Sequence, residues 1–141
     1  MLLIGPAGTG KTCAALCMMD YIRDGRVYRT MDTACGEIIK AQKGELYAGD
    51  YPVSETGWWD RWKKAAIVCM DEIGTREKAS DFHYSVLKRS IDERLNLPAI
   101  FISNLTLDQI RAVYDERISS RLGAGTVIKV GGADRRSAGQ Q

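Results

Sequence analysis

The sequence lacks the features that mark membrane, secreted and disordered proteins. No hydrophobic run approaches the roughly 18 residues of a membrane span, and the N-terminal MLLIG run has neither a basic start nor a cleavage site. Only three of the 141 residues are proline, while 45% are hydrophobic, which argues against wholesale disorder. We therefore expect one compact, cytoplasmic domain with no membrane partner.

Charge of one sign, histidine and paired cysteines are also scarce. Twenty Lys and Arg residues nearly balance eighteen Asp and Glu residues, so the net charge of +2 does not predict wrapping of nucleic acid. Any polyanion site must be local. Histidine occurs once, at His83, and the four cysteines form no CxxC pair. We expect no zinc site and interpret the cysteines as buried, reduced thiols.

Apolar runs of β type alternate with helical patterns along the whole chain. This order predicts an α/β fold with a mainly parallel sheet. The expected strands are Leu2–Ile4, Val27–Met31, Ala65–Met70, Ala99–Ser103 and Thr126–Val130. The expected helices are Lys11–Ile22, Ala34–Gln42, Thr56–Lys63, Asp81–Leu95, Leu107–Tyr114 and Glu116–Leu122. The segment Lys43–Ser54 has no clear period and is interpreted as a surface loop or a short irregular insertion.

A glycine-rich segment after the first strand matches the phosphate-binding pattern G-x-x-x-x-G-K-[ST]. Its residues are Gly5, Pro6, Ala7, Gly8, Thr9, Gly10, Lys11 and Thr12. Glycines let the backbone curl and turn its N–H groups toward phosphates. We expect Lys11 to reach the β- and γ-phosphates of ATP and Thr12 to bind Mg²⁺. The flanking strand and helix argue against the alternative, a simple glycine-rich turn.

Two acids follow the apolar run that ends at Met70. Open α/β sheets place their ligands at the carboxyl ends of strands, so carboxylates at this point indicate a site. Side chains alternate along a strand, so Asp71 and Glu72 should point different ways. We expect Asp71 to be a Mg²⁺ ligand and Glu72 to be the general base or water-positioning residue. A solvated acidic turn is the alternative.

Asn104 follows another expected strand, Ala99–Ser103. If this strand lies between the phosphate-loop strand and the strand with the two acids, Asn104 faces the γ-phosphate and can orient the attacking water. A turn or helix-cap role is the alternative, because Asn is common at such positions.

These motifs together resemble a known family. The phosphate loop, the DEIG of Asp71–Gly74, the SN of Ser103-Asn104 and the stretch DERISSRL of Asp115–Leu122 are similar, in this order, to the ATPase domain of DnaC-type helicase loaders, which are AAA+ ATPases. The IstB transposition ATPase looks like a close relative. The resemblance covers residues 2–136 and implies a P-loop three-layer αβα sandwich with a five-stranded parallel sheet and no C-terminal lid. We therefore expect an ATPase domain over residues 1–136 and a polar tail over 137–141.

The resemblance also implies roles for three kinds of residue. It places the strand ending at Asn104 in the middle of the site, as a sensor of the γ-phosphate. Arg121 matches an arginine finger that completes the ATP site of a neighbouring subunit, and Arg117 lies one helical turn earlier. A salt-bridged helix surface involving the nearby acids is the alternative for both. Arg136, or its neighbour Arg135, matches a terminal arginine near the nucleotide.

The partners implied by the resemblance are a replicative helicase, single-stranded DNA and further copies of the chain. Met1 lies four residues before the phosphate loop, so we expect the family's N-terminal helicase-binding region to be absent here. In the family, a helix inserted after the second strand binds the DNA, which makes Lys40 and Lys43 candidate phosphate contacts. Trp58, Trp59 and Trp62 have helical spacing and are interpreted as core.

Other functions stay open at this point. An IstB-like transposition ATPase would share the site but use a different partner. A small P-loop kinase would share the phosphate loop, although no clear lid segment is present. A nucleotide-gated binding module without hydrolysis is a third possibility, against which Glu72 argues.

Overall fold

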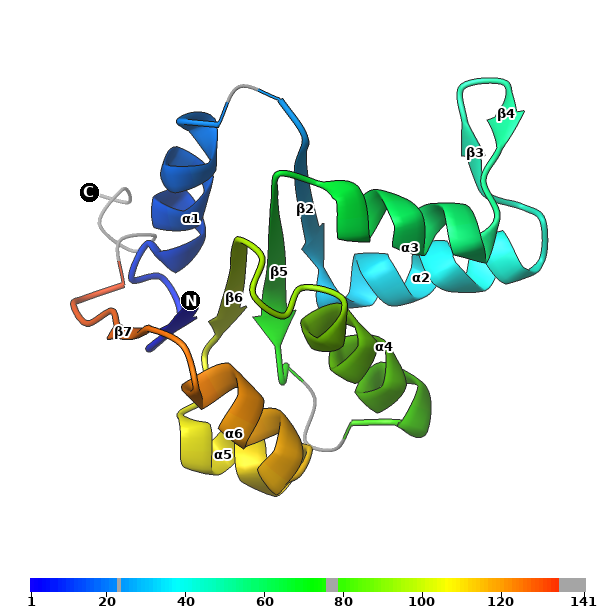
Figure 1. Cartoon of the computed structure of the whole chain (residues 1–141). Helices are drawn as coiled ribbons and strands as arrows, with labels where there is room; N and C mark the ends of the chain where they lie inside the picture. The colour runs from blue at the N-terminus through cyan, green and yellow to red at the C-terminus, as the bar shows by residue number, and fades with distance from the viewer. Residues whose placement is uncertain (23, 76–78, 135–141) are drawn as a thin grey trace.

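The computed structural model describes residues 1–22, 24–75 and 79–134. Helices and strands alternate along the chain as the sequence predicts (Figure 1). In chain order the elements are β1 (Leu2–Ile4), α1 (Lys11–Asp20), β2 (Arg26–Thr30), α2 (Met31–Gln42), β3 (Tyr47–Ala48), β4 (Tyr51–Pro52), α3 (Glu55–Lys64), β5 (Ile67–Ile73), α4 (Asp81–Asp92), β6 (Ala99–Ser103), α5 (Leu107–Val113), α6 (Glu116–Gly123) and β7 (Val127–Lys129).

The main sheet has five strands in the order β2-β5-β6-β1-β7, and every neighbouring pair is parallel. Strand β6 therefore lies between β1, which leads into the phosphate loop, and β5, which carries the two acids. This is the placement on which the sensor role of Asn104 depended. The carboxyl ends of β1, β5 and β6 meet at one edge of the sheet.

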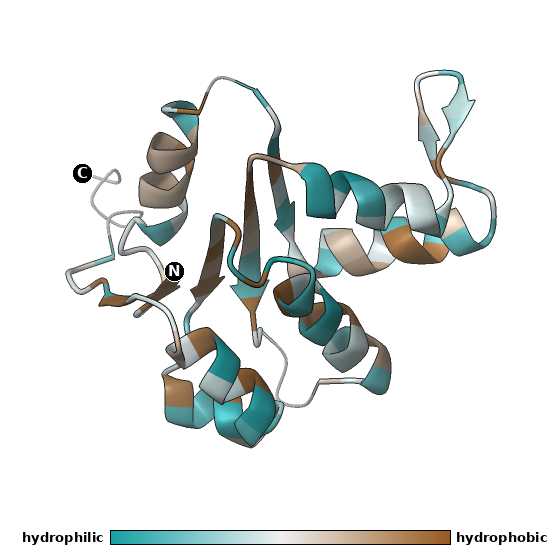
Figure 2. Cartoon of the chain, viewed as in Figure 1, coloured by the Kyte–Doolittle hydropathy of each residue, from teal (hydrophilic) through white to brown (hydrophobic). Residues whose placement is uncertain are grey.

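The central strand β5 is buried on both faces, as its continuous apolar run indicates. Val68, Met70 and Ile73 belong to one core cluster, while Ile67 and Cys69 belong to a second cluster on the other face. The central strands are accordingly the most hydrophobic segments of the chain (Figure 2). Burial on both sides confirms the expected three-layer α/β fold.

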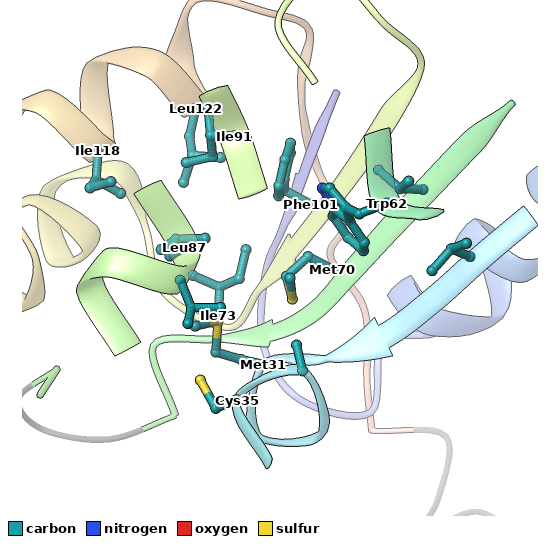
Figure 3. Packing of buried hydrophobic residues seen from close by; sticks show 14 of the residues in the cluster. Met31, Cys35, Trp62, Met70, Ile73, Leu87, Ile91, Phe101, Ile118 and Leu122 are labelled. Atoms are coloured by element: carbon teal, nitrogen blue, oxygen red, sulfur yellow. The ribbon is translucent and has the colours of Figure 1, made fainter. Parts of the chain in front are cut away.

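The two helical layers are unequal. Helix α1 packs through Ala15 and Met19 onto one face of the sheet. The opposite face is covered by α2, α3, α4, α5 and α6, and Figure 3 shows the larger core that they form with the sheet. Because α1 is the one helix on its side in the described chain, its outer face stays open to solvent (Figure 1).

Most elements begin or end one to three residues from the expected position, and β5 and α2 are two examples. Strand β5 does not stop at Met70 but continues to Ile73, so both acids lie inside it, at an irregularity in its pairing with β6. Helix α2 begins at Met31 rather than at Ala34, because the side chain of Thr30 caps it by accepting a hydrogen bond from the backbone N–H of Thr33.

The segment Lys43–Ser54 is more regular than expected. It contains a short antiparallel hairpin of β3 and β4, which projects away from the helices (Figure 1). Its strands are only two residues long, too short for alternation to show in the sequence. The tyrosines Tyr47 and Tyr51 are exposed on it.

The three tryptophans of α3 are core residues, as predicted. Trp58, Trp59 and Trp62 are all buried, and the rings of Trp58 and Trp62 stack with centroids 5.8 Å apart. The indole Nε1 of Trp62 donates to the carbonyl oxygen of Ser90 at 3.1 Å. These side chains are therefore not available as a stacking surface for bases.

The interpretation of the cysteines is correct for only two of the four. Cys35 and Cys69 are buried, but Cys13 and Cys17 are exposed. Both exposed cysteines lie on α1, whose buried stripe passes through Lys11, Ala15 and Met19. Hydrophobic residues on a helix that is covered on one side only must in part face solvent.

No helix within the described residues combines the length and the apolar character that crossing a membrane requires. No helix follows β7 in the same part of the chain. The candidate residue Arg136, its neighbour Arg135 and the expected tail 137–141 lie outside the described residues.

Candidate functional site: a nucleotide cleft

A cleft of about 650 Å³ opens at the sheet edge where β1, β5 and β6 end. The phosphate loop and the start of α1 form one wall, and Asp71, Glu72 and Asn104 form part of the other. Its volume lies within the roughly 300–1,000 Å³ of small-molecule sites. The structure thus brings together most of the residues that the sequence singled out, although they are up to a hundred residues apart.

The phosphate loop has the tight backbone that its glycines permit. Gly8 and Gly10 have φ angles of 75° and 92°, which residues with a side chain rarely adopt. At Gly5 the close neighbour is what excludes a side chain: a Cβ atom would lie 2.0 Å from the carbonyl oxygen of Val130. The loop must therefore keep glycine at these positions to hold its shape.

Lys11 is folded back onto the loop. Its Nζ atom donates to the carbonyl oxygens of Gly5 and Pro6, at 2.7 and 2.6 Å, and the residue is only 5% exposed. Thr9 also closes the loop by donating from Oγ1 to the same carbonyl of Pro6 at 2.9 Å. The cation is thus positioned at the loop that the sequence predicts to hold phosphates.

Asp71 is a buried carboxylate held by three donors. Its Oδ2 atom accepts from Thr12 Oγ1 at 2.6 Å and from Tyr28 Oη at 2.9 Å, and its Oδ1 atom accepts from the backbone N–H of Glu72 at 2.7 Å. A hydroxyl and a carboxylate in contact form the oxygen-only donor set that Mg²⁺ prefers. Thr12 and Asp71 therefore fit the metal that the sequence predicts for them.

Glu72 differs from Asp71 in its exposure and in its backbone conformation. It is exposed and lines the cleft, and its φ angle of 60° is in the left-handed region, which is uncommon for residues other than glycine. Strained backbone of this kind occurs frequently at functional sites. The two neighbouring acids thus have the different environments that strand alternation predicts.

Asn104 is exposed and lines the cleft directly after β6. The preceding residue, Ser103, is fully buried and ties the strand ends together. Its Oγ atom donates to the carbonyl oxygen of Ile73 at 2.6 Å and accepts from the N–H of Leu105 at 3.0 Å. These two hydrogen bonds of Ser103 hold the end of β6 beside the end of β5, where Asn104 lines the cleft.

Tyr28 is the site residue that sequence reasoning missed. It comes from β2 and reaches Asp71 across the sheet, since it pairs with Cys69, two residues before that acid. Burial and the hydrogen bond to Asp71 raise the pKa of Tyr28, so its hydroxyl remains a donor. Without the pairing of β2 with β5, nothing in the sequence connects this tyrosine with the acid.

The two candidate arginines of α6 lie elsewhere. Arg121 is not among the described residues that line the cleft. Its guanidinium forms an ion pair with Asp92 on α4. Arg117 is exposed on the same helix. Asp115, one of the acids considered as a partner, instead caps α6 and accepts hydrogen bonds from the N–H of Ile118 and the hydroxyl of Tyr84, which lower its pKa.

Comparison with solved structures identifies the same fold. A DnaC helicase loader has a TM-score of 0.75 at 15% identity, over 93% of this chain and 77% of its own. The protein DnaI has a TM-score of 0.63 at 20% identity, over 96% and 72%. A replication initiator DnaA bound to AMPPCP and single-stranded DNA has a TM-score of 0.74 at 15% identity, over 94% of this chain but only 40% of its own.

Comparison with sequences gives the family. No curated protein matches the chain as a relative. The family model of the ATPases associated with various cellular activities matches residues 1–123, a range that holds the phosphate loop, both acids, Asn104 and Arg121. The match therefore covers the described site and every helix and strand before β7, and the chain belongs to this family, the AAA ATPases.

Proposed function

We propose that the chain binds and hydrolyses MgATP in this cleft, as the ATPase domain of a DNA replication protein of the helicase-loader type. One observation carries the proposal of a MgATP site: the 2.6 Å hydrogen bond between Thr12 Oγ1 and Asp71 Oδ2. It joins the end of the phosphate loop to the buried acid of β5. Membership of an ATPase family supports hydrolysis in addition to binding.

Each residue of the cleft would have its own task. Lys11 would hold the β- and γ-phosphates, while Thr12 and Asp71 would hold Mg²⁺. The metal, when bound, neutralises charge that develops on the phosphates. Glu72 would accept the proton of the attacking water, and Asn104, on the neighbouring strand, would help to orient that water.

Single-stranded DNA is the proposed polymer ligand. Lys40 and Lys43, at the end of α2, are exposed, and the hairpin that follows presents Tyr47 and Tyr51 to solvent. Cations beside accessible aromatic rings suit phosphate neutralisation and base stacking. The similarity in fold to a DnaA bound to single-stranded DNA supports this part of the proposal.

Assembly with further copies of the chain and interaction with a replicative helicase complete the proposal. Arg121 lies outside its own cleft and would serve the cleft of a neighbour, where a cation can stabilise charge on the γ-phosphate. The helicase is proposed from the resemblance to loaders. Arg136 stays a prediction. Membership of an ATPase family favours this function over a small P-loop kinase.

Two substitutions test hydrolysis separately from binding. Lys11→Ala should abolish MgATP binding, because the cation of the phosphate loop is lost. Glu72→Gln should bind ATP with nearly unchanged affinity and fail to turn it over. Glu45→Gln, at an exposed residue before the hairpin, is the matched control. Normal turnover by the Glu72 variant, measured as released phosphate, would show that the catalytic assignment is wrong.

A further inference from the structure

Two of the four cysteines lie together inside the nucleotide cleft. Cys13 and Cys17 are four residues apart on α1, so they occupy the same face in successive turns. Both are exposed and both line the cleft. The sheet-facing side of the helix, at Ala15 and Met19, is buried. This solvent-facing thiol pair has no part in the chemistry proposed above.

The two thiols also interact with each other. The pKa of Cys17 is raised, first because a thiolate at Cys13 would repel a second one and then through a hydrogen bond with Cys13. Within the described residues no cluster of three metal-binding side chains exists, so no third ligand completes a metal site here. The other two cysteines, Cys35 and Cys69, are 4% and 0% exposed, and they belong to different core clusters.

We propose that Cys13 and Cys17 form a redox-sensitive dithiol site that reacts with low-molecular-weight disulfides of the glutathione type, and that the resulting disulfide keeps nucleotide out of the cleft. The regulatory half of this proposal rests on the proposed binding of ATP. The chemical half rests on the thiol pair alone.

The reaction balances as two thiol–disulfide exchanges. One cysteine of the pair loses its proton and attacks a sulfur of the reagent, whose S–S bond breaks, and the leaving thiolate takes up a proton. The second cysteine then attacks the mixed disulfide in the same way, and the second half of the reagent leaves as a thiol. Overall, two cysteine thiols are oxidised to one disulfide, and one disulfide of the reagent is reduced to two thiols.

Helix geometry couples this reaction to the phosphate loop. Residues four apart on an α-helix have Cα atoms about 6 Å apart, which a disulfide can bridge, but Cβ atoms about 5–6 Å apart. A disulfide requires a Cβ separation of roughly 3.5–4.5 Å. The first two turns of α1 must therefore deform before the bond can close.

This deformation affects the groups that bind phosphate. Cys13 follows Thr12 directly and belongs to the first turn, in which the N–H of Ala14 donates to the carbonyl of Gly10 at 2.9 Å. The N–H groups of a helix's first turn are those that an anion uses. A strained disulfide is also easily reduced, which suits a reversible switch. By linkage, bound nucleotide must protect the thiols to the same extent that the disulfide weakens nucleotide binding.

The test treats the reduced full chain with oxidised glutathione and measures thiols and nucleotide affinity separately. We expect intact-protein mass to fall by that of two hydrogen atoms and peptide mapping to join Cys13 to Cys17. The Kd of a fluorescent ATP analogue should rise about tenfold or more, within the range usual for coupled sites, and return after dithiothreitol. Saturating nucleotide should lower the fraction of disulfide at equilibrium with oxidised and reduced glutathione.

Cys17→Ser is the decisive variant, because it removes the second thiol at an exposed position. Its affinity for the analogue, compared before and after exposure to the reagent and dialysis, should not show the wild-type loss. In the wild-type chain, free thiols at both Cys13 and Cys17 after treatment, a mixed adduct as the final product, or a disulfide that leaves the Kd unchanged would each overturn the proposal. If the reduced protein binds no nucleotide at all, the proposed function fails instead, and the mass measurement still decides whether the dithiol site exists.

Discussion

Arg121 of α6 forms an ion pair with Asp92 of α4 in its own chain. Both side chains remain partly exposed, at 45% and 35%. An ion pair this accessible contributes only roughly 0.5 kcal/mol to the free energy of unfolding. An anion that binds the arginine more tightly can therefore displace Asp92. This weak ion pair is compatible with two roles for Arg121: an ion pair on the helix surface, or a cation that completes the ATP site of a neighbouring subunit. The two roles predict different effects of substitution on ATP hydrolysis.

The first prediction concerns Arg121. In trans action, Arg121→Ala should lower ATP hydrolysis by roughly 10³–10⁵-fold while ATP binding and thermal stability remain nearly unchanged. Mixing this variant with Lys11→Ala should restore part of the activity, because some neighbouring pairs then contain one intact cleft and one intact arginine. Phosphate release is the measurement, at protein concentrations where the wild type assembles. A mixture that stays inactive excludes action in trans.

The second prediction concerns Asp92, as the control for the first. Asp92→Asn removes the intramolecular partner of Arg121 but keeps the arginine. It should change thermal stability little and should not reduce hydrolysis. Equal losses of activity in the Asp92 and Arg121 variants would show that the ion pair itself, rather than the free cation, is what matters.

The third prediction concerns Tyr28, which donates to the buried Asp71. Tyr28→Phe removes one of the three donors that hold this carboxylate, so the Mg²⁺ concentration needed for half-maximal nucleotide binding should rise about tenfold. Affinity for ATP without Mg²⁺ should change much less. Tyr51→Phe is the matched control, because Tyr51 is 78% exposed on the hairpin. Equal losses with and without Mg²⁺ would assign Tyr28 a structural role only.

The fourth prediction concerns DNA. Replacing Lys40 and Lys43 together with Gln should weaken binding of single-stranded DNA and reduce the slope of log K against log salt by about 0.7 per lost contact. Lys63→Gln with Lys64→Gln, at the end of α3, removes the same charge elsewhere. If the Lys63 and Lys64 double variant lowers this slope by the same amount, the effect comes from net charge and not from contacts between DNA and the end of α2.

The fifth prediction concerns Arg94, a buried cation that stabilises the fold. Its guanidinium donates to the carbonyls of Trp62, Lys63, Ala65 and Pro98, at 3.3, 2.9, 2.8 and 2.6 Å, and the residue is 3% exposed. Arg94→Met removes the guanidinium donor from all four carbonyls, of which that of Pro98 still accepts from the N–H of Val68 at 3.3 Å, and should lower the free energy of unfolding by about 3 kcal/mol. Chemical denaturation measures it, and Lys64→Met, at a 76% exposed side chain, should cost far less.

The sequence by itself determined the parts of this protein whose signals are contiguous. Eight successive residues specify the phosphate loop, because the glycines, the lysine and the threonine that bind phosphate and metal are all neighbours in the sequence. The pattern of β5 likewise predicts that Asp71 and Glu72 end in different environments, since alternation is a local property of a strand. The order of elements also predicted the α/β class.

Only the tertiary structure decided which distant residues meet. The position of β6 between β1 and β5, the reach of Tyr28 to Asp71 and the pairing of Arg121 with Asp92 all depend on contacts across many residues of chain. The exposure of Cys13 and Cys17 depends on a different fact, namely that α1 covers its side of the sheet alone. Composition and periodicity do not predict these long-range contacts. The contacts form only when helices and strands from distant parts of the chain pack against one another.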